Sequence, residues 1–203
     1  GGPAGWCGRG GRGEGLERAG RTRALERRSG VQATLMRATI HLVSRADYWP
    51  LTAAIRAERR AWWERTHNKQ PDPVQARAAG KRLRVFLAGR PRRWKEIQER
   101  FGREDALAAA QYVDIVRVPP SGTWEQRRAD LYGLAEEWVG PDEAGEQEGL
   151  ELLVRRYLRG FGPATPAEVA DFGMVSIKRV RGALERMQLR RFRGEDGKEL
   201  VDL

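Results

Sequence analysis

The stretch that decides the fold lies near the carboxyl end of the chain, where residues 163–186 read PATPAEVADFGMVSIKRVRGALER. Thr165 and Glu168 form a helix-start signal. A threonine hydroxyl and a glutamate carboxylate three residues later can each accept a hydrogen bond from the other residue's backbone N–H. Pro166, between them, suits the first position of the helix. Gly173 ends this short helix, and Ser176 is placed to cap the next one. Two helices joined by a glycine-containing turn predict a helix-turn-helix.

One helix before this motif and one hairpin after it complete a unit. Apolar residues recur at helical spacing from Leu150 to Arg159. Residues 189–193 and 198–201 are typical of strands, and the Asp-Gly pair between them suits a tight turn. Three helices followed by a two-stranded hairpin are the elements of a winged helix, which normally lays its third helix in the DNA major groove and its hairpin, the wing, along the backbone.

The surfaces that such a unit would turn toward DNA are basic in this sequence. In the third helix Val180, Ala183 and Leu184 share one face, whereas Lys178 and Arg181 point away from it. The alternative to DNA binding is a solvated cationic face without a partner. The residues predicted to contact DNA in this unit are Ser176, Lys178, Arg181, Arg190, Arg191 and Arg193.

The same plan recurs upstream. Helices are expected from about residue 79 to 89, from 94 to 101 and from 106 to 112, followed by strands at 113–118 and 128–134. Gly89 and Gly102 precede Gly160 and Gly173 by 71 residues each, since 160 − 89 and 173 − 102 are both 71. This spacing predicts tandem winged helices. The candidate phosphate contacts in the upstream unit are Arg92, Arg93 and Lys95.

Before this unit, residues 35–43 are rich in β-forming side chains and are predicted to form one strand. A long helix, capped at Ser44, is predicted to follow it to about residue 66. Because side chains alternate along a strand, Arg37, Thr39 and His41 would share one face, which could meet DNA phosphate. The alternative for His41 is a partly buried histidine that is hydrogen-bonded to a neighbour.

The predicted fold class is therefore α+β, mostly helical, with tandem winged-helix units.

The first 30 residues differ from the rest of the chain, because ten of the 24 glycines and seven arginines lie there. This segment is expected to be disordered, with helix possible only at 16–28. It is also expected to be a fragment edge or a mistranslated start. The predicted domains are 1–30 (disordered), 31–75 (the remnant of an N-terminal winged-helix unit), 76–140 (a winged helix) and 148–203 (a winged helix truncated at the wing), with an acidic linker at 141–149.

Composition narrows the class of function. The 203 residues carry 38 lysines and arginines against 28 acidic residues, a formal charge of +10, and the pI is near 10.5. This balance suggests a nucleic-acid partner. One cysteine and two histidines exclude an intramolecular disulfide framework and offer no structural zinc set, so no metal and no cofactor is expected. No apolar run is long enough to cross a bilayer and no signal peptide opens the chain, so we expect a cytoplasmic protein with no membrane partner. The expected partner is duplex DNA, and a monomer is expected because no coiled coil or added dimerisation helix is seen.

Five of the tryptophans are expected to pack in the core and between helices rather than to stack on bases: Trp62, Trp63, Trp94, Trp124 and Trp138.

Two stretches resemble a known family. Residues 36–43, MRATIHLV, resemble the Met-Arg-Gly-Thr-Leu-His-Leu-Val signature of a bacterial family of winged-helix DNA-binding proteins, and residues 157–171, with their GPATPAEVA run, resemble a later signature of the same family. The family includes the AlkZ/YcaQ-type DNA glycosylases, which unhook interstrand crosslinks and remove alkylated purines. The resemblance implies tandem winged helices, duplex DNA as partner and, for some members, base excision without a metal or an organic cofactor.

The chain departs from this family at the catalytic motif. The glycosylases use Gln-x-Gln or Gln-x-Asp, well upstream of the first signature, to position the attacking water. Here Gln32-Ala33-Thr34 lies immediately before Met36, so it occupies the predicted strand, and no catalytic residue is assigned. Besides DNA binding in base-excision repair, two alternatives stay open: a non-enzymatic transcriptional regulator and a protein-interaction module.

Overall fold

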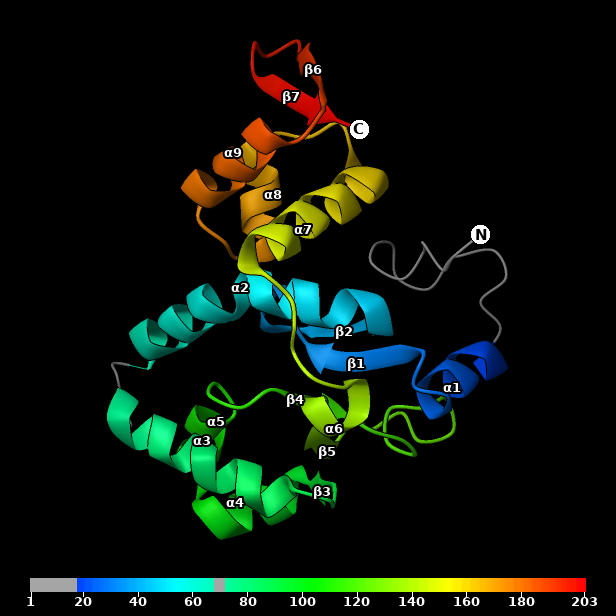
Figure 1. The fold of residues 1–203 in the computed structure, drawn as a ribbon, viewed down its shortest axis with the longest axis vertical. Coiled ribbons are helices and arrows are strands. Elements are labelled where there is room, and N and C mark those ends of the chain that lie inside the picture. Colours follow the sequence, from blue (N-terminus) through cyan, green and yellow to red (C-terminus); the bar gives the residue numbers. More distant parts are fainter. Residues whose placement is uncertain (1–17, 68–71) are drawn as a thin grey trace. The chain divides into compact units, whose positions relative to one another are not determined.

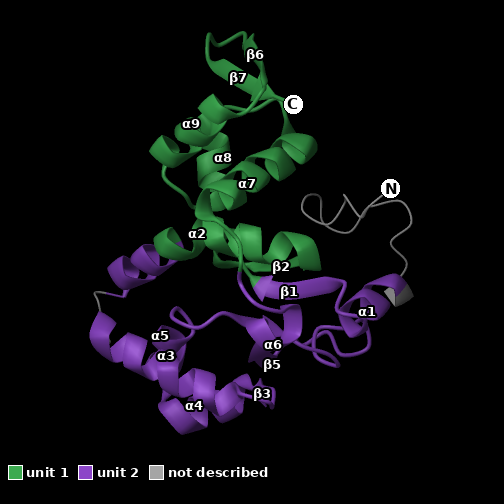
Figure 2. Cartoon of the chain, in the orientation of Figure 1, with its two compact units in different colours: residues 1–15, 34–58, 143–203 green, residues 16–33, 59–142 purple. Residues whose placement is uncertain are grey.

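A computed structural model describes residues 18–67 and 72–203. The chain forms two compact units, shown in different colours in Figure 2. Unit 1 contains residues 34–58 and 143–203, and unit 2 contains the described residues up to Ala33 together with 59–142. In the described part of the chain, every helix is too short or too polar to span a bilayer. The fold is α+β and mostly helical, as predicted.

Unit 2 combines helices with a small antiparallel sheet. Its elements are α1 (Arg18–Glu26), β1 (Gly30–Thr34), the second part of α2 (Arg45–Thr66), α3 (Pro73–Leu87), β3 (Arg92–Arg93), α4 (Trp94–Phe101), α5 (Arg103–Ala109), β4 (Ile115–Arg117), β5 (Leu131–Leu134) and α6 (Ala135–Val139). The strands in this unit lie in the order β1-β4-β5-β3. Arg117 of β4 pairs with both Gln32 of β1 and Tyr132 of β5, which fixes the register.

The core of unit 2 forms where α3, α4 and α5 pack together. Leu83, Leu87 and Ile97 are fully buried there, and Trp94 and Phe101 pack against them. Each buried aliphatic side chain of this size contributes about 1.5–3 kcal/mol to folding. Trp63 is buried in a second cluster, so the expectation that tryptophans pack in the core is met at these positions.

Unit 1 contains the helix-turn-helix. Its elements are the 3₁₀ turn η1 (Met36–Ala38), β2 (Ile40–Ser44), the first part of α2, then α7 (Glu146–Phe161), α8 (Pro166–Gly173), α9 (Ile177–Arg186), β6 (Arg190–Arg193) and β7 (Glu199–Asp202). α7 and α8 both pack on α9, and the β6–β7 hairpin follows α9 (Figure 1). Leu153, Val169, Val180 and Leu184 make the shared core.

The helix caps predicted from sequence are present in this unit. Thr165 and Glu168 make a capping box at the start of α8, with the Thr165 N–H donating to the Glu168 carboxylate at 2.7 Å and the Glu168 N–H donating to the Thr165 hydroxyl at 3.2 Å. The Ser176 hydroxyl accepts from the Arg179 N–H at the start of α9. At the start of α2 the Ser44 hydroxyl accepts from the Asp47 N–H. Side-chain caps of this kind contribute about 1 kcal/mol each.

The prediction of one strand over residues 35–43 is wrong. The chain reverses at η1, where Arg37 and Ala38 have φ of 55° and 52° and the Leu35 N–H donates to the Thr39 carbonyl. The left-handed backbone at Arg37 and Ala38 interrupts the extended conformation that a continuous strand needs, and the turn buries Leu35 and Met36, which are both 1% exposed or less.

The tandem repeat keeps its element order but not its 71-residue spacing. Helices α3, α4 and α5 are followed by two strands, as predicted. However, Gly102 alone separates α4 from α5 with φ of 82°, while Gly173 is still helical and Met174 takes the left-handed conformation after α8. The two glycines therefore have different roles, and the interpretation as tandem winged helices stays a prediction, as do the domain limits drawn from it.

Three further boundaries are corrected. Residues 18–26 form α1, inside the range where helix was considered possible, so the expected disorder of 1–30 is wrong for this part; residues 1–17 lie outside the described residues. The expected linker 141–149 is shorter, because α7 begins at Glu146. The two strands of the wing each begin one residue later than predicted, since β6 and β7 pair from Arg190↔Asp202 to Arg193↔Glu199; the truncation of the wing stays a prediction.

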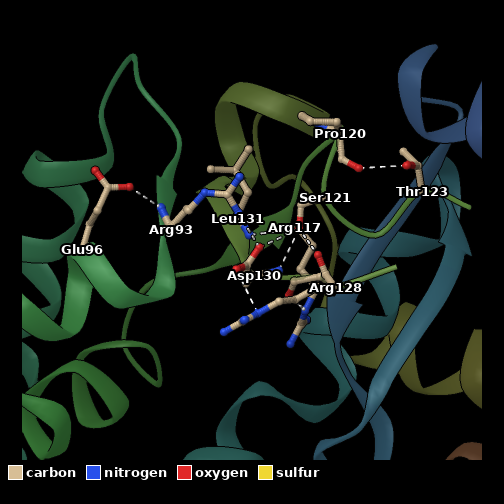
Figure 3. Close-up of polar contacts among 10 residues, drawn as sticks. Arg93, Glu96, Arg117, Pro120, Ser121, Thr123, Arg128, Asp130 and Leu131 are labelled. Carbon is tan, nitrogen blue, oxygen red and sulfur yellow. Dashed lines mark hydrogen bonds and ion pairs between the residues drawn. The ribbon is translucent and has the colours of Figure 1, made fainter. Parts of the chain in front are cut away.

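The loop between β4 and β5 is also longer than predicted. The Ser121 hydroxyl donates to the Arg128 carbonyl at 2.7 Å and accepts from the N–H groups of Asp130 and Leu131 at 2.7 and 3.1 Å (Figure 3). These bonds satisfy backbone groups that would otherwise need a strand partner. β5 therefore begins at Leu131 and not at Arg128.

Candidate nucleic-acid interface

The outer face of α9 carries the first group of candidate residues. Lys178 and Arg181 are exposed, and neither makes an ion pair among the residues that the structure describes. Val180, Ala183 and Leu184, on the opposite face, are buried. The division of the helix into a buried apolar face and an exposed cationic face is the one predicted, because the helical period separates these positions.

The hairpin carries the second group. All four residues of β6 are exposed, and three of them are the arginines 190, 191 and 193. Arg191 pairs with Glu199 of β7 at 2.5 Å, whereas Arg190 and Arg193 have no acidic partner within the described parts of the chain. An exposed ion pair contributes only about 0–1 kcal/mol, so a phosphate could replace Glu199 at little cost.

Lys198 of this hairpin is held in its charged form by Asp196. Its Nζ lies 2.6 Å from Asp196 Oδ2, and this hydrogen bond to Asp196 raises the pKa of Lys198 above its ordinary value. The same contact lowers the pKa of Asp196. Lys198 therefore stays protonated over the whole physiological pH range.

The two groups meet at a groove within unit 1. It lies between the start of α8, the outer face of α9 and the hairpin, and its volume is about 390 Å³. Arg181, Arg191 and Lys198 line it together with Glu185 and Glu199. The lining residues therefore carry a net charge of +1, from three cations and two carboxylates.

Two other cations of α9 have structural roles. Arg179 donates from Nη1 to Glu58 Oε2 at 2.6 Å and from Nη2 to the Ala54 carbonyl at 3.0 Å, and it also pairs with Glu146. Arg186 pairs with Glu151 of α7 at 3.1 Å. The positive charges of Arg179 and Arg186 are therefore offset inside unit 1 and add little to its outer field. Ser176, predicted to contact DNA, uses its hydroxyl as the cap of α9.

The cations predicted for unit 2 are largely engaged. The Arg92 guanidinium lies 4.6 Å from the centre of the Phe86 ring and 3.7 Å from Glu96. Arg93 Nη1 donates to Asp130 Oδ1 at 2.9 Å (Figure 3), and Lys95, which is highly exposed, lies 3.7 Å from Glu99. Through these contacts Arg92 and Arg93 help to position α4 and the start of β5. Their contact with DNA stays a prediction.

The turn at η1 brings together two of its three candidate residues. His41 Nε2 lies 3.0 Å from both the Met36 carbonyl and the Thr39 hydroxyl, which itself donates to the Met36 carbonyl at 3.1 Å. Burial lowers the pKa of His41, although the contact with Met36 acts the other way. Arg37 is exposed on the left-handed backbone of the turn. The geometry therefore favours the alternative prediction, in which His41 is a partly buried histidine that is hydrogen-bonded to its neighbours.

Sequence analysis missed the groove as a site. Ile177, the first residue of α9, is 40% exposed and lines the groove together with Arg181. The exposure of Ile177 could have been predicted from its position at the start of α9, since a side chain in the first turn has no preceding turn of its own helix to cover it. No group of three or more histidine, cysteine, aspartate or glutamate side chains suited to a metal ion occurs among the described residues.

Comparisons with known proteins agree with this fold. An α+β chain with a capped helix-turn-helix and a basic hairpin has the features of a nucleic-acid-binding protein. The family model for DNA glycosylase AlkZ-like proteins matches residues 10–203, and the chain therefore belongs to this family. The structure is similar to that of the Streptomyces sahachiroi DNA glycosylase AlkZ, with a TM-score of 0.72 and 16% identity over 92% of this chain and 56% of that one. The chain thus spans little more than half the length of that protein. No curated protein matches.

Proposed function

We propose that this chain binds duplex DNA through α9 and the β6–β7 hairpin, and that this binding serves the repair of damaged bases. The observation that carries the proposal is the outer surface of unit 1, where Lys178, Arg181 and the arginines of β6 are exposed, and where Lys178 and Arg181 have no ion-pair partner among the described residues. A helix of this width fits the major groove, and cations on a wing can follow the phosphates.

The roles of these residues differ. Lys178 and Arg181 lie on the exposed face of a helix, where they can reach base edges or phosphates. Arg190 and Arg193 lie on a two-stranded hairpin and suit phosphate contacts, which position the protein without reading sequence. Arg37, on the exposed turn at η1, is a further candidate for phosphate contact.

The link to DNA repair rests on the family to which the chain belongs. The similar structure is named as a DNA glycosylase, and an enzyme of that class must take its target base out of the stack before cleaving the bond to the sugar. We assign no catalytic residue in this chain, and we propose only that its DNA binding contributes to such a reaction.

The proposal is tested by fluorescence anisotropy with a labelled duplex of about 20 base pairs, titrated between about 50 and 200 mM salt. We expect affinity to fall steeply with salt, with a slope in log Kd of about 0.9 per neutralised phosphate. The double variant Lys178→Ala, Arg181→Ala should bind at least about tenfold more weakly. The double variant Lys81→Ala, Arg100→Ala, which removes the same charge from unit 2, is the matched control and should bind nearly as the original chain does.

Equal weakening by both double variants would mean that only net charge matters, and it would contradict the placement of α9 on DNA. Absence of binding at low salt, with circular dichroism showing a folded chain, would contradict DNA binding itself. Release of a base from alkylated duplex, measured as alkali-labile sites, tests whether the chain also carries the excision step.

A further inference from the structure

A second groove lies in unit 2. It is formed between α3 and α4, has a volume of about 630 Å³, and is lined by Lys81, Arg82, Val85, Phe86, Arg100 and Phe101. It is larger than the groove beside the hairpin, and sequence analysis assigned none of its residues to a site. The four lining residues of α3 follow the spacing of one helix face, because positions three and four apart lie above each other.

The floor of this groove is apolar and reaches solvent. Val85 is 77% exposed although it lies within α3, and Phe86 and Phe101 are only partly covered. Single exposed apolar residues are ordinary, but an exposed valine that continues into two partly open aromatic rings makes a contiguous patch, which is typical of an interaction site.

The rim of the groove is cationic. Lys81 and Arg100 make no ion pair in the described part of the chain, and Arg82 has only a contact of 4.0 Å with Asp105, in which both side chains are about half exposed or more. None of the six lining residues is acidic. A partner for this rim must therefore supply negative charge.

The aromatic rings argue against a nucleic acid as that partner. The Arg92 guanidinium lies over the Phe86 ring at 4.6 Å, and the rings of Phe86 and Phe101 meet edge to face with centroids 5.8 Å apart and planes at 71°. Binding of a single strand relies on open aromatic faces on which bases stack, and here one face of Phe86 is covered by a cation. Duplex DNA would meet this site with phosphates, which gain nothing from the apolar floor.

We propose that the groove between α3 and α4 docks an acidic amphipathic segment of a partner protein. Its apolar side chains would lie against Val85 and Phe101, and its carboxylates would meet Lys81, Arg82 and Arg100. Laying the apolar face of a helix in a groove is a recurrent mode of peptide recognition. This site is independent of the proposed DNA surface on α9.

The test uses a fluorescein-labelled amphipathic peptide of about 14 residues, with leucine at every third or fourth position, glutamate at the positions that flank this apolar face and alanine elsewhere, titrated with the full chain at low salt. We expect saturable binding that the variant Val85→Glu and the double variant Lys81→Glu, Arg100→Glu each weaken at least about tenfold. All three side chains are exposed, so the fold should persist, which circular dichroism checks. The double variant Lys178→Ala, Arg181→Ala is the control and should bind the peptide as the original chain does.

Three results would overturn the proposal. The first is no binding of the acidic peptide up to about 1 mM. The second is equal binding of a peptide with lysine in place of glutamate, or binding that Val85→Glu leaves unchanged. The third is displacement of the acidic peptide by a single-stranded oligothymidine that binds more tightly and depends on Lys81 and Arg100, because the groove would then be a nucleic-acid site.

Discussion

Arg156 of α7 donates from Nη2 to Asp47 Oδ1 of α2 at 2.8 Å, across 109 residues of sequence. Both side chains are mostly covered, with exposed fractions of 20% and 13%. This ion pair fastens the first turn of α2 to the helix that opens the helix-turn-helix, and no feature of local sequence indicates it.

Removal of one partner from this pair should destabilise the chain. Arg156→Met leaves the Asp47 carboxylate covered and without its cation, and we expect the free energy of unfolding to fall by about 2–3 kcal/mol. The double variant Asp47→Leu, Arg156→Met should recover most of that loss, because an apolar pair of similar volume often replaces a covered ion pair without cost. Urea unfolding measures both. Lys95→Met, which breaks an exposed pair with Glu99, is the control and should change stability by less than about 0.5 kcal/mol.

Two helical glycines should respond to alanine in opposite directions. A Cβ added at Gly149 of α7 would lie 2.0 Å from the Pro50 carbonyl oxygen, a backbone atom that cannot move aside. Gly149→Ala should therefore destabilise the chain by about 2 kcal/mol or more, like other substitutions that overfill a packed site. Gly182→Ala in α9 meets no atom closer than the end of Arg186 at 3.7 Å. It should stabilise by up to about 1 kcal/mol through helix propensity. Thermal unfolding of the two variants compares them directly, and a stabilised Gly149→Ala would contradict the close approach of α7 to α2.

The wing should contribute to DNA affinity without sequence preference. Arg190→Ser with Arg193→Ser removes two exposed cations that lack acidic partners among the described residues. We expect all duplex sequences to bind more weakly by similar factors, and the salt slope to fall by about two, one for each lost phosphate contact. Anisotropy against two duplexes of unrelated sequence measures this. A loss confined to one duplex would show that the wing reads bases.

Stability should fall slightly on mild acidification because of His41. Burial lowers the pKa of His41 in the folded chain below the ordinary value of 6.5. Below pH 6.5 the unfolded chain therefore binds more protons than the folded one, and the free energy of unfolding decreases as pH falls through this window. The original chain should lose more stability between about pH 7.5 and 5.5 than His41→Gln does, as measured by urea unfolding at both values. Equal losses would mean that His41 takes up its proton as easily in the folded chain as in the unfolded one.

The sequence predicted the elements whose signals are local. Caps at Ser44, Thr165 and Ser176, the two faces of α9 and the Asp-Gly turn of the wing all depend on residues a few positions apart. For this reason the helix-turn-helix and the candidate residues Lys178, Arg181 and Arg190 could be named before any coordinates were known. Tertiary contacts left no such signal, and the errors lie there. The turn at η1 buries Leu35 and Met36, and the loop before β5 is held by hydrogen bonds between Ser121 and residues 128–131.

Local signals thus define the class of fold, the position of the helix-turn-helix and the sign of its surface, because helical period and capping chemistry act within one turn. The tertiary structure decided which cations remain free. Arg179 and Arg181 are two residues apart on one helix, yet Arg179 is held by Glu58 and Glu146 while Arg181 faces an open groove. Only the packing of α9 within unit 1 assigns them these different roles, because the largely covered contacts of Arg179 hold its guanidinium in place.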